Sequence, residues 1–207
     1  MLNTANTVEN HSNKSIWCIC GPTAVGKTGL AIALAKALGT EIISFDSRQF
    51  YQEIPIGTAA PDKGETSRVK HHFILDRSIK DEINAGTFAE EAHLKIAALH
   101  QKHDNLILVG GSGLYLKALT EGFDPMPEIA PGVREELNHQ LAQNGIETLQ
   151  MELSKTDPEY FAQVDQQNPQ RIIRALEVIR SSGETFSSFR KSDKQLLPFK
   201  VRKIGLN

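Results

Sequence analysis

A single eight-residue stretch constrains the fold more than any other part of this 207-residue chain. The stretch matches the pattern G-x-x-x-x-G-K-[ST] without substitution, as Gly21, Pro22, Thr23, Ala24, Val25, Gly26, Lys27 and Thr28. The apolar run 16–20 before it predicts a buried strand, and the run 29–38, ended by Gly39, predicts a helix. A glycine-rich turn between a strand and a helix predicts an α/β fold that holds a diphosphate or triphosphate. The flanking elements argue against a chance match in an ordinary turn.

Three side chains near this turn have predicted chemical roles. Lys27 would place its ammonium group between phosphates, and Thr28 would offer its hydroxyl to a magnesium ion, Mg²⁺. The run 41–45 predicts a second strand that ends at Asp46. Because ligands of open α/β sheets lie beyond the carboxyl ends of strands, we expect Asp46 near the phosphates. The alternative is that Asp46 only caps a helix or a turn.

The chain up to residue 122 continues to alternate between strands and helices. Further strands are predicted at 71–75, 106–109 and 199–206, and further helices at 87–103 and 114–119. On a strand, His71 and His72 would point to opposite faces and could not share a metal. The strand 106–109 leads into a second glycine turn that contains Ser112. It lacks the terminal acidic residue that binds magnesium in many P-loop ATPases, which argues against a standard ATPase.

The chain changes character after residue 122. A proline-containing linker is followed by helical spacing of apolar residues, and the final helix is predicted to begin at Asn168 and Pro169 and to end at Gly183. On that helix Arg171 and Arg174 lie three residues apart and can share a face. We interpret residues 1–14 as a loose leader and residues 15–122 as a P-loop core. Residues 123–190 would form an inserted helical domain that closes over the site, and residues 191–207 would return a strand to the core.

Charge is unevenly distributed in an otherwise ordinary composition. The chain is 40% hydrophobic and 23% charged, with a net charge of -2. Between residues 170 and 203, nine lysines and arginines stand against three acidic residues, so this segment carries +6. Such a segment could bind an anionic polymer, or it could be an ordinary solvated surface. Two cysteines and the lack of a long apolar run predict a cytoplasmic protein that has no disulfide and does not act at a membrane.

Six sequence blocks together resemble the tRNA dimethylallyltransferases, the bacterial tRNA isopentenyltransferase family. They are residues 21–28, 46–51, 56–59, 71–73, 110–119 and 168–178. The resemblance implies a P-loop NTPase-like parallel sheet flanked by helices, with a small inserted helical domain. It also implies transfer of a dimethylallyl group from dimethylallyl diphosphate to N6 of an adenosine. That adenosine lies just 3′ of the anticodon in tRNAs that read U-initial codons. The loop 21–28 would then bind a diphosphate leaving group.

The resemblance also implies roles for single residues. Asp46 would orient the N6 amine and take its proton, while Lys27, the loop amides and magnesium on Thr28 would stabilise charge on the diphosphate. Ser112 stands where the family has threonine and would contact the base or the diphosphate. The adenine would leave the anticodon-loop stack to reach the pocket, with Gln49 available to the purine edge. The implied tRNA-contacting residues are Asp46, Ser47, Arg48, Gln49, Ser112, Arg134, Gln170, Arg171, Ile172, Ile173 and Arg174.

Three departures from the family pattern affect these expectations. Serine at Ser112 keeps the hydroxyl, whereas Ala60 stands where many members have lysine and removes one possible anion contact. Members of the family also continue well beyond the position of Asn207, with a helix that carries a further catalytic arginine. We therefore expect the C-terminal part of the family fold to be missing. We expect this chain to bind phosphate but to turn over substrate weakly or not at all. We also expect it to be a monomer.

Three other functions are compatible with parts of the sequence. A small P-loop kinase of metabolites would use ATP, with Arg171 or Arg174 as a lid arginine. A related prenyltransferase would act on free adenine nucleotides, although the basic segment and the helical insertion favour a macromolecular acceptor. A tRNA-binding module would keep the fold without the activity. The partners expected under the main interpretation are the tRNA anticodon stem-loop and dimethylallyl diphosphate.

Overall fold

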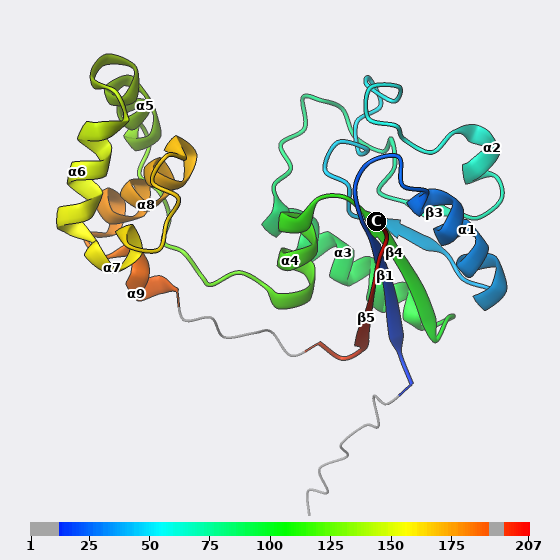
Figure 1. Cartoon of the computed structure of the whole chain (residues 1–207). Coiled ribbons are helices and arrows are strands. Elements are labelled where there is room, and N and C mark those ends of the chain that lie inside the picture. The colour runs from blue at the N-terminus through cyan, green and yellow to red at the C-terminus, as the bar shows by residue number, and fades with distance from the viewer. Residues whose placement is uncertain (1–12, 191–196) are drawn as a thin grey trace, which may run out of the picture. The chain divides into compact units, whose positions relative to one another are not determined.

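The computed structural model describes residues 13–190 and 197–207, which fall into two compact units. The sheet unit comprises residues 13–122 and 197–207, and the helical unit comprises residues 123–190 (Figure 1). Most of the predicted leader, residues 1–12, lies outside the described residues. Lys14 belongs to the sheet unit, because its ammonium group donates to the His100 carbonyl and pairs with Asp104 at 2.8 Å.

The sheet unit is built on a five-stranded parallel sheet with the strand order β3–β2–β4–β1–β5. The strands are β1 (Ser15–Cys20), β2 (Ile42–Ser44), β3 (His71–His72), β4 (Asn105–Gly110) and β5 (Lys200–Gly205). Its helices are α1 (Lys27–Leu38), α2 (Lys63–Thr66), α3 (Ala85–His100) and α4 (Gly113–Glu121). The predicted parallel sheet flanked by helices is therefore confirmed.

Helices cover both faces of this sheet, as Figure 1 shows for α1 on one side and for α3 and α4 on the other. Alternate residues of β1 and β4 point to opposite faces. One face packs Ile16, Leu106 and Leu108 against α3 and α4, and the other packs Ile19 and Ile107 against α1. Burial on both faces explains why these strands read as continuous apolar runs.

The edge strands differ from the predictions in instructive ways. The strand predicted at 71–75 ends after His72, because Phe73 (φ 59°) and Leu75 (φ 48°) adopt left-handed backbone conformations that break the extended chain. At the other edge, β5 pairs with β1 from Ser15 opposite Lys200 onward, close to the predicted position. The short helix α2 was not predicted.

The helical unit consists of α5 (Val133–Asn144), α6 (Ile146–Thr156), α7 (Pro158–Phe161), α8 (Pro169–Ser182) and α9 (Phe186–Phe189). The long helix α8 has the predicted ends. The Asn168 side chain accepts a hydrogen bond from the Arg171 amide at 3.3 Å, and Gly183 follows the last turn. The core of the unit gathers apolar side chains from α5, α6, α8 and α9, including Leu137, Leu149, Leu176 and Phe186.

The buried carboxylate of Asp157 links the two short helices of this unit, which were not predicted. It accepts hydrogen bonds from the Tyr160 amide at 3.0 Å, the Ser187 amide at 2.8 Å and the Ser187 hydroxyl at 2.9 Å. Asp157 is 1% exposed, so these donors replace the water that the carboxylate loses on folding.

Two other expectations can be compared with the described residues. Both cysteines lie on β1 without a disulfide, and burial raises the pKa of the Cys18 thiol to about 12, so the thiol stays protonated. Within residues 13–190 and 197–207, no helix has the length and apolar character needed to cross a bilayer.

Candidate functional site

The carboxyl ends of β1, β4 and β2 lie side by side at one edge of the sheet. Cys20 at the end of β1 pairs with Gly110 at the end of β4, and Val109 pairs with Ser44 at the end of β2. The three loops that follow these strands therefore start at the same edge. Because β4 lies between the other two strands, the backbones of β1 and β2 are about 10 Å apart. A Cβ on Gly110 would lie 2.7 Å from the Phe45 ring, so this close approach requires glycine.

The loop 21–28 curls between β1 and α1. Positive φ angles occur at Gly21 (154°), Ala24 (66°) and Gly26 (93°), and such conformations are typical of backbone concavities whose amides bind anions. A Cβ on Gly21 would lie 2.5 Å from the Leu206 carbonyl oxygen, because the chain after β5 passes directly over this glycine. The Leu206 amide donates to the Cys20 carbonyl at 2.9 Å and holds that crossing in place.

The Lys27 ammonium group lies back against its own loop. It donates to the carbonyls of Gly21 at 3.0 Å and Pro22 at 2.7 Å. These two contacts use two of the three donors of the ammonium group. A phosphate that enters the loop would replace these neutral carbonyl acceptors with negatively charged oxygens, which attract the ammonium group more strongly.

Asp46 lies two residues beyond β2, next to the glycine turn that follows β4. One carboxylate oxygen accepts from the Arg48 amide at 3.2 Å, so the turn role that the sequence allowed is present. The other oxygen, Oδ2, would lie 3.4 Å from a Cβ placed on Gly111. Asp46 therefore has one oxygen in the turn and the other beside the β4 loop, where an incoming group could meet it.

A hydrogen-bonded serine pair joins the loops after β2 and β4. The Ser112 hydroxyl accepts from the Ser47 amide at 2.9 Å, and the two hydroxyls lie 2.9 Å apart. These residues are separated by 65 positions in sequence, so no local pattern could reveal the contact. The pair holds Ser112 beside the residue that follows Asp46.

The side-chain amide of Gln49 forms hydrogen bonds within the protein. Its Nε2 donates to the carbonyls of Thr58 at 3.3 Å and Ala59 at 3.1 Å, and its Oε1 lies 3.5 Å from the Ser44 hydroxyl. Gln49 thus fastens the loop 54–60 to the end of β2. A contact between Gln49 and a purine edge would require these bonds to be exchanged.

The fit of magnesium depends on oxygen ligands near the loop. The Thr28 hydroxyl makes no hydrogen bond to any described residue, and no group of three His, Cys, Asp or Glu residues able to hold a metal occurs in 13–190 or 197–207. Magnesium commonly binds through few protein oxygens together with substrate phosphates and water. A magnesium ion that is bound mainly by substrate phosphates and water would need few protein ligands, and the Thr28 hydroxyl would be available as one of them.

The predicted RNA-contacting residues of the helical unit divide into two groups. The side chains of Gln170, Arg171 and Arg174 are at least partly exposed on α8. Ile172 and Ile173 are 0% and 1% exposed and lie in the helical core, so their predicted contact with tRNA is corrected to core packing. Because α8 buries one stripe of residues in the core, only the residues on its other face can contact RNA.

Glu177 on α8 connects two of the predicted arginines. Arg134 on α5 and Arg174 on α8 both form ion pairs with its carboxylate. Glu177 was missed by the sequence analysis, although a signal existed. It stands four residues after Ile173, at a position of the apolar stripe where a carboxylate is unusual.

The basic segment 170–203 is shared between the two units. Arg180 pairs with Glu152 and Glu136 inside the helical unit, and the guanidinium of Arg190 lies over the Tyr160 ring at 5.2 Å. Lys200, Arg202 and Lys203 belong to β5 of the sheet unit, and Lys191 and Lys194 lie outside the described residues. The charge excess is therefore not evidence of a single basic face.

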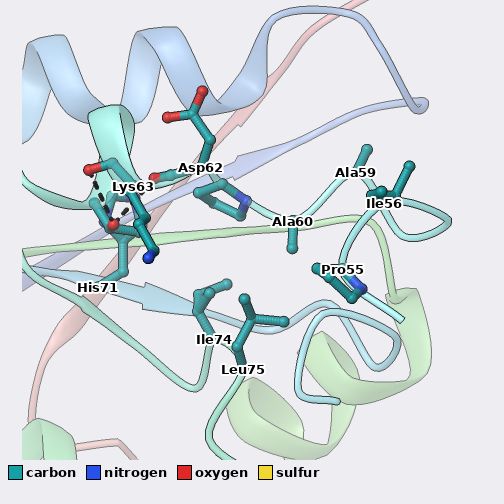
Figure 2. Close-up of a pocket in the computed structure, with 11 residues that line it drawn as sticks. Pro55, Ile56, Ala59, Ala60, Asp62, Lys63, His71, Ile74 and Leu75 are labelled. Atoms are coloured by element: carbon teal, nitrogen blue, oxygen red, sulfur yellow. Dashed lines mark hydrogen bonds between the residues drawn. The ribbon is translucent and has the colours of Figure 1, made fainter. Parts of the chain in front are cut away.

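A separate pocket of about 640 Å³ is lined in part by the loop 54–60. Figure 2 shows Ala60, Ile74 and Leu75 among the side chains that line it, with Asp62 and Lys63 also in its wall. Ala60, where the family resemblance leads us to expect lysine, contributes only a methyl group to this mainly apolar wall.

Comparison with known proteins adds a family to this geometry. A model of the family described as IPP transferase matches residues 49–207. A protein from Christiangramia forsetii named tRNA dimethylallyltransferase is 50% identical over 188 residues, which cover 91% of this chain and 62% of that protein. The related protein from Cytophaga hutchinsonii, which has the same name, is 46% identical over 195 residues, covering 94% of this chain and 64% of its own length.

Solved structures show the same likeness. The full-length tRNA isopentenylpyrophosphate transferase from Bacillus halodurans has 34% identity and a TM-score of 0.57, and the match covers 93% of this chain and 59% of that chain. A eukaryotic dimethylallyltransferase acting on tRNA has 25% identity and a TM-score of 0.74, with 93% and 48% covered. The chain thus spans 62% and 64% of the two curated relatives, and the remainder of each relative lies outside the match.

Proposed function

This chain belongs to the IPP transferase family, and from that membership we propose that it transfers a dimethylallyl group to tRNA. The donor is dimethylallyl diphosphate, and the acceptor is N6 of the adenosine that follows the anticodon in tRNAs reading U-initial codons. The observation that carries the proposal is the meeting of the loop 21–28, Asp46 and Ser112 at one edge of the sheet in a chain of this family.

The reaction forms one bond and breaks one. N6 attacks the first carbon of the dimethylallyl group, the bond between that carbon and the diphosphate oxygen breaks, and diphosphate leaves with the electron pair. N6 must lose a proton, because the nitrogen that forms the new bond would otherwise carry a positive charge. Its lone pair is delocalised into the purine ring, so the amine is a poor nucleophile and needs a base. Asp46 accepts this proton through the carboxylate oxygen that is not engaged with the Arg48 amide.

The loop 21–28 stabilises the leaving group. Its curled amides and the N-terminus of α1 attract the negative charge that develops on diphosphate, and Lys27 exchanges its two carbonyl contacts for phosphate oxygens. A magnesium ion, held by Thr28 and the diphosphate, supplies further positive charge when bound. Ser112, held by Ser47, lies where it can donate to the base or the diphosphate.

The helical unit binds the RNA. Arginine suits this task because its planar guanidinium binds phosphates through several donors and stacks on unpaired bases. The proposed contacts are Gln170, Arg171, Arg174 and Arg134, together with the residues around Asp46 that meet the flipped adenosine. We expect the protein to act as a monomer in the cytoplasm, where its tRNA substrate is found.

Two incubations test the proposal. In the first, the chain is mixed with an RNA hairpin of anticodon stem-loop sequence and radiolabelled dimethylallyl diphosphate, and in the second with ATP and magnesium. Slow incorporation of label into the RNA is the expected result. Release of ADP would instead identify a metabolite kinase, and retention of RNA without label would identify a binding module.

The Asp46→Asn variant tests the proposed base. An asparagine oxygen can still accept from the Arg48 amide, so the turn is kept while the proton acceptor is lost. We expect the rate of transfer to fall about 10²- to 10⁴-fold, with RNA affinity unchanged in a filter-binding assay. Transfer at the unmodified rate would show that Asp46 is not the base.

A further inference from the structure

A buried carboxylate lies beneath two partly exposed arginines in the helical unit. Glu177 has a side-chain exposure of 2%, whereas Arg134 and Arg174 are 54% and 41% exposed. The Arg134 guanidinium donates to Glu177 through Nε and also through Nη2 at 3.4 Å, and Arg174 donates through Nη1 at 3.2 Å. The carboxylate thus joins α5 to α8.

The position of Glu177 within its helix makes the arrangement costly. Its neighbours Leu176 and Val178 are both 0% exposed, and it continues the stripe of Ile173 into the helical core. A buried ion pair adds little net stability compared with an apolar residue of similar size. Stability of the fold therefore gives no sufficient reason for a carboxylate here.

The pairing instead determines where two cations stand. Each guanidinium has five N–H donors in a rigid plane, and Glu177 uses only some of them. The remaining donors of Arg134 and Arg174 are free for an anion outside the protein. Arg171 lies three residues before Arg174 on α8, so the two can share a face of the helix. Arg171 forms no ion pair with the part of the chain that is described. Arg134, Arg174 and Arg171 are together called the arginine row.

We propose that Glu177 is a positioning residue, which holds Arg134 and Arg174 as a fixed pair that binds the phosphate backbone of the acceptor RNA. This inference rests on the proposed function, since it takes tRNA to be the acceptor. Arginine side chains lose considerable freedom when they bind, and a carboxylate that has already ordered them reduces that loss. The hydrogen bonds that Arg134 donates to the Glu177 carboxylate also raise the pKa of this guanidinium, as expected for a close ion pair.

Simple electrostatics predicts the opposite effect of changing this residue. Replacing a carboxylate beneath two arginines by a neutral amide makes the local potential more positive, so RNA should bind more tightly. If Glu177 acts by positioning, the Glu177→Gln variant should bind more weakly, because the amide cannot hold both guanidinium groups through charged hydrogen bonds. The sign of the change therefore separates the two effects.

The experiment measures RNA affinity over a range of salt concentrations with the full 207-residue chain and an anticodon stem-loop hairpin. We expect Glu177→Gln to weaken binding about tenfold. The variant Glu152→Gln is the control. It also removes a carboxylate that forms an ion pair with an arginine of the helical unit, but that arginine is Arg180, which is not one of the proposed RNA contacts. The control should bind as the unmodified chain does or slightly more tightly.

A mutant cycle between Glu177 and the two arginines distinguishes positioning from a general loss of structure. In a chain that already carries Arg134→Ala and Arg174→Ala, the change Glu177→Gln should have no further effect on affinity. Each arginine change should also lower the slope of log affinity against log salt by about 0.7 to 0.9. Circular dichroism at the assay temperature reports whether each variant is folded.

Each outcome decides a separate point. Equal or tighter binding by Glu177→Gln, while the arginine variants bind weakly, would overturn the positioning role and leave the proposed RNA acceptor intact. Unchanged affinity in the arginine variants would overturn the positioning role, because the pair would not bind RNA. Failure of the unmodified chain to bind the hairpin would overturn both the RNA acceptor and the inference that depends on it.

Discussion

The two units of this protein organise their candidate functional residues in different ways. In the sheet unit, Ser47, which follows Asp46, and Ser112 come from loops far apart in sequence and meet because β2 and β4 are neighbours in register. In the helical unit, Arg171 and Arg174 share a face of one helix, and a single buried carboxylate, Glu177, adds Arg134 from a second helix.

This difference shows how each site depends on its own unit. The sheet-edge site depends on strand order, so any change that shifts a strand moves several of its groups together. The arginine row depends on helix periodicity and one ion-pair cluster, so it tolerates change elsewhere but fails when that cluster is broken. Chemistry and RNA binding would then respond to different substitutions.

A core substitution should have the largest effect and tests whether the units unfold independently. Leu176 is 0% exposed in the helical core, and Leu176→Ala should destabilise that unit by about 2–5 kcal/mol. The chain has one tryptophan, Trp17 on β1, so its fluorescence reports the sheet unit while circular dichroism reports both. We expect the part of the circular dichroism signal that comes from the helical unit to be lost at lower denaturant concentration, while the Trp17 transition stays unchanged.

The reverse change provides the control. Leu108 on β4 is 1% exposed in the core of the sheet unit, and Leu108→Ala should move the Trp17 transition instead. If either variant moved both transitions together, the chain would unfold as one cooperative body and the comparison of two independent units would be wrong.

A glycine substitution should have an intermediate effect confined to the sheet unit. Gly21→Ala would place a Cβ 2.5 Å from the Leu206 carbonyl oxygen, which belongs to rigid backbone, so β5 or the loop must shift. We expect a loss of about 1–3 kcal/mol in the Trp17 transition and weaker binding of diphosphate in calorimetry. RNA affinity of the helical unit should not change.

Gly29→Ala is the matched control for this experiment. A Cβ on Gly29 would meet nothing within 4 Å, and the residue lies within α1, where alanine favours the helix by about 1 kcal/mol. A destabilisation equal to that of Gly21→Ala would mean that the contact with Leu206 is not the cause.

Mild acid should have the smallest effect and should also distinguish the units. Burial lowers the pKa of four histidines, all in the sheet unit: His71, His72, His93 and His100. These groups bind protons more readily in the unfolded chain, so their contribution to stability is present above the unfolded pKa of about 6.5 and is lost as the pH falls below it. The Trp17 transition should weaken between about pH 7 and pH 5, while the helical unit changes less.

Replacing one of these residues sharpens that result. His93→Leu removes one partly buried titrating group and should make the pH dependence of the Trp17 transition shallower. A sheet unit whose stability does not change over this range would contradict the argument from burial.

Local signals predicted the parts of the fold that depend on neighbours in sequence. The helix α8 begins and ends as predicted, because Asn168, Pro169 and Gly183 determine its ends through their own hydrogen-bonding and backbone preferences. The strand predicted at 71–75 is shorter than expected, because the left-handed conformations of Phe73 and Leu75 depend on the surrounding packing. The burial of Ile172 and Ile173 follows from the helical spacing of apolar residues on α8, whereas the family motif alone placed both among the RNA contacts.

By itself, the sequence determined the loop 21–28, the strand and helix on either side of it and the apolar stripe of α8, because each follows from residues within a few turns of one another. Only the tertiary structure decided that Ser47 meets Ser112, that Leu206 crosses Gly21 and that Glu177 joins Arg134 to Arg174. These contacts connect residues distant in sequence, and they form only when packing brings their strands and helices together.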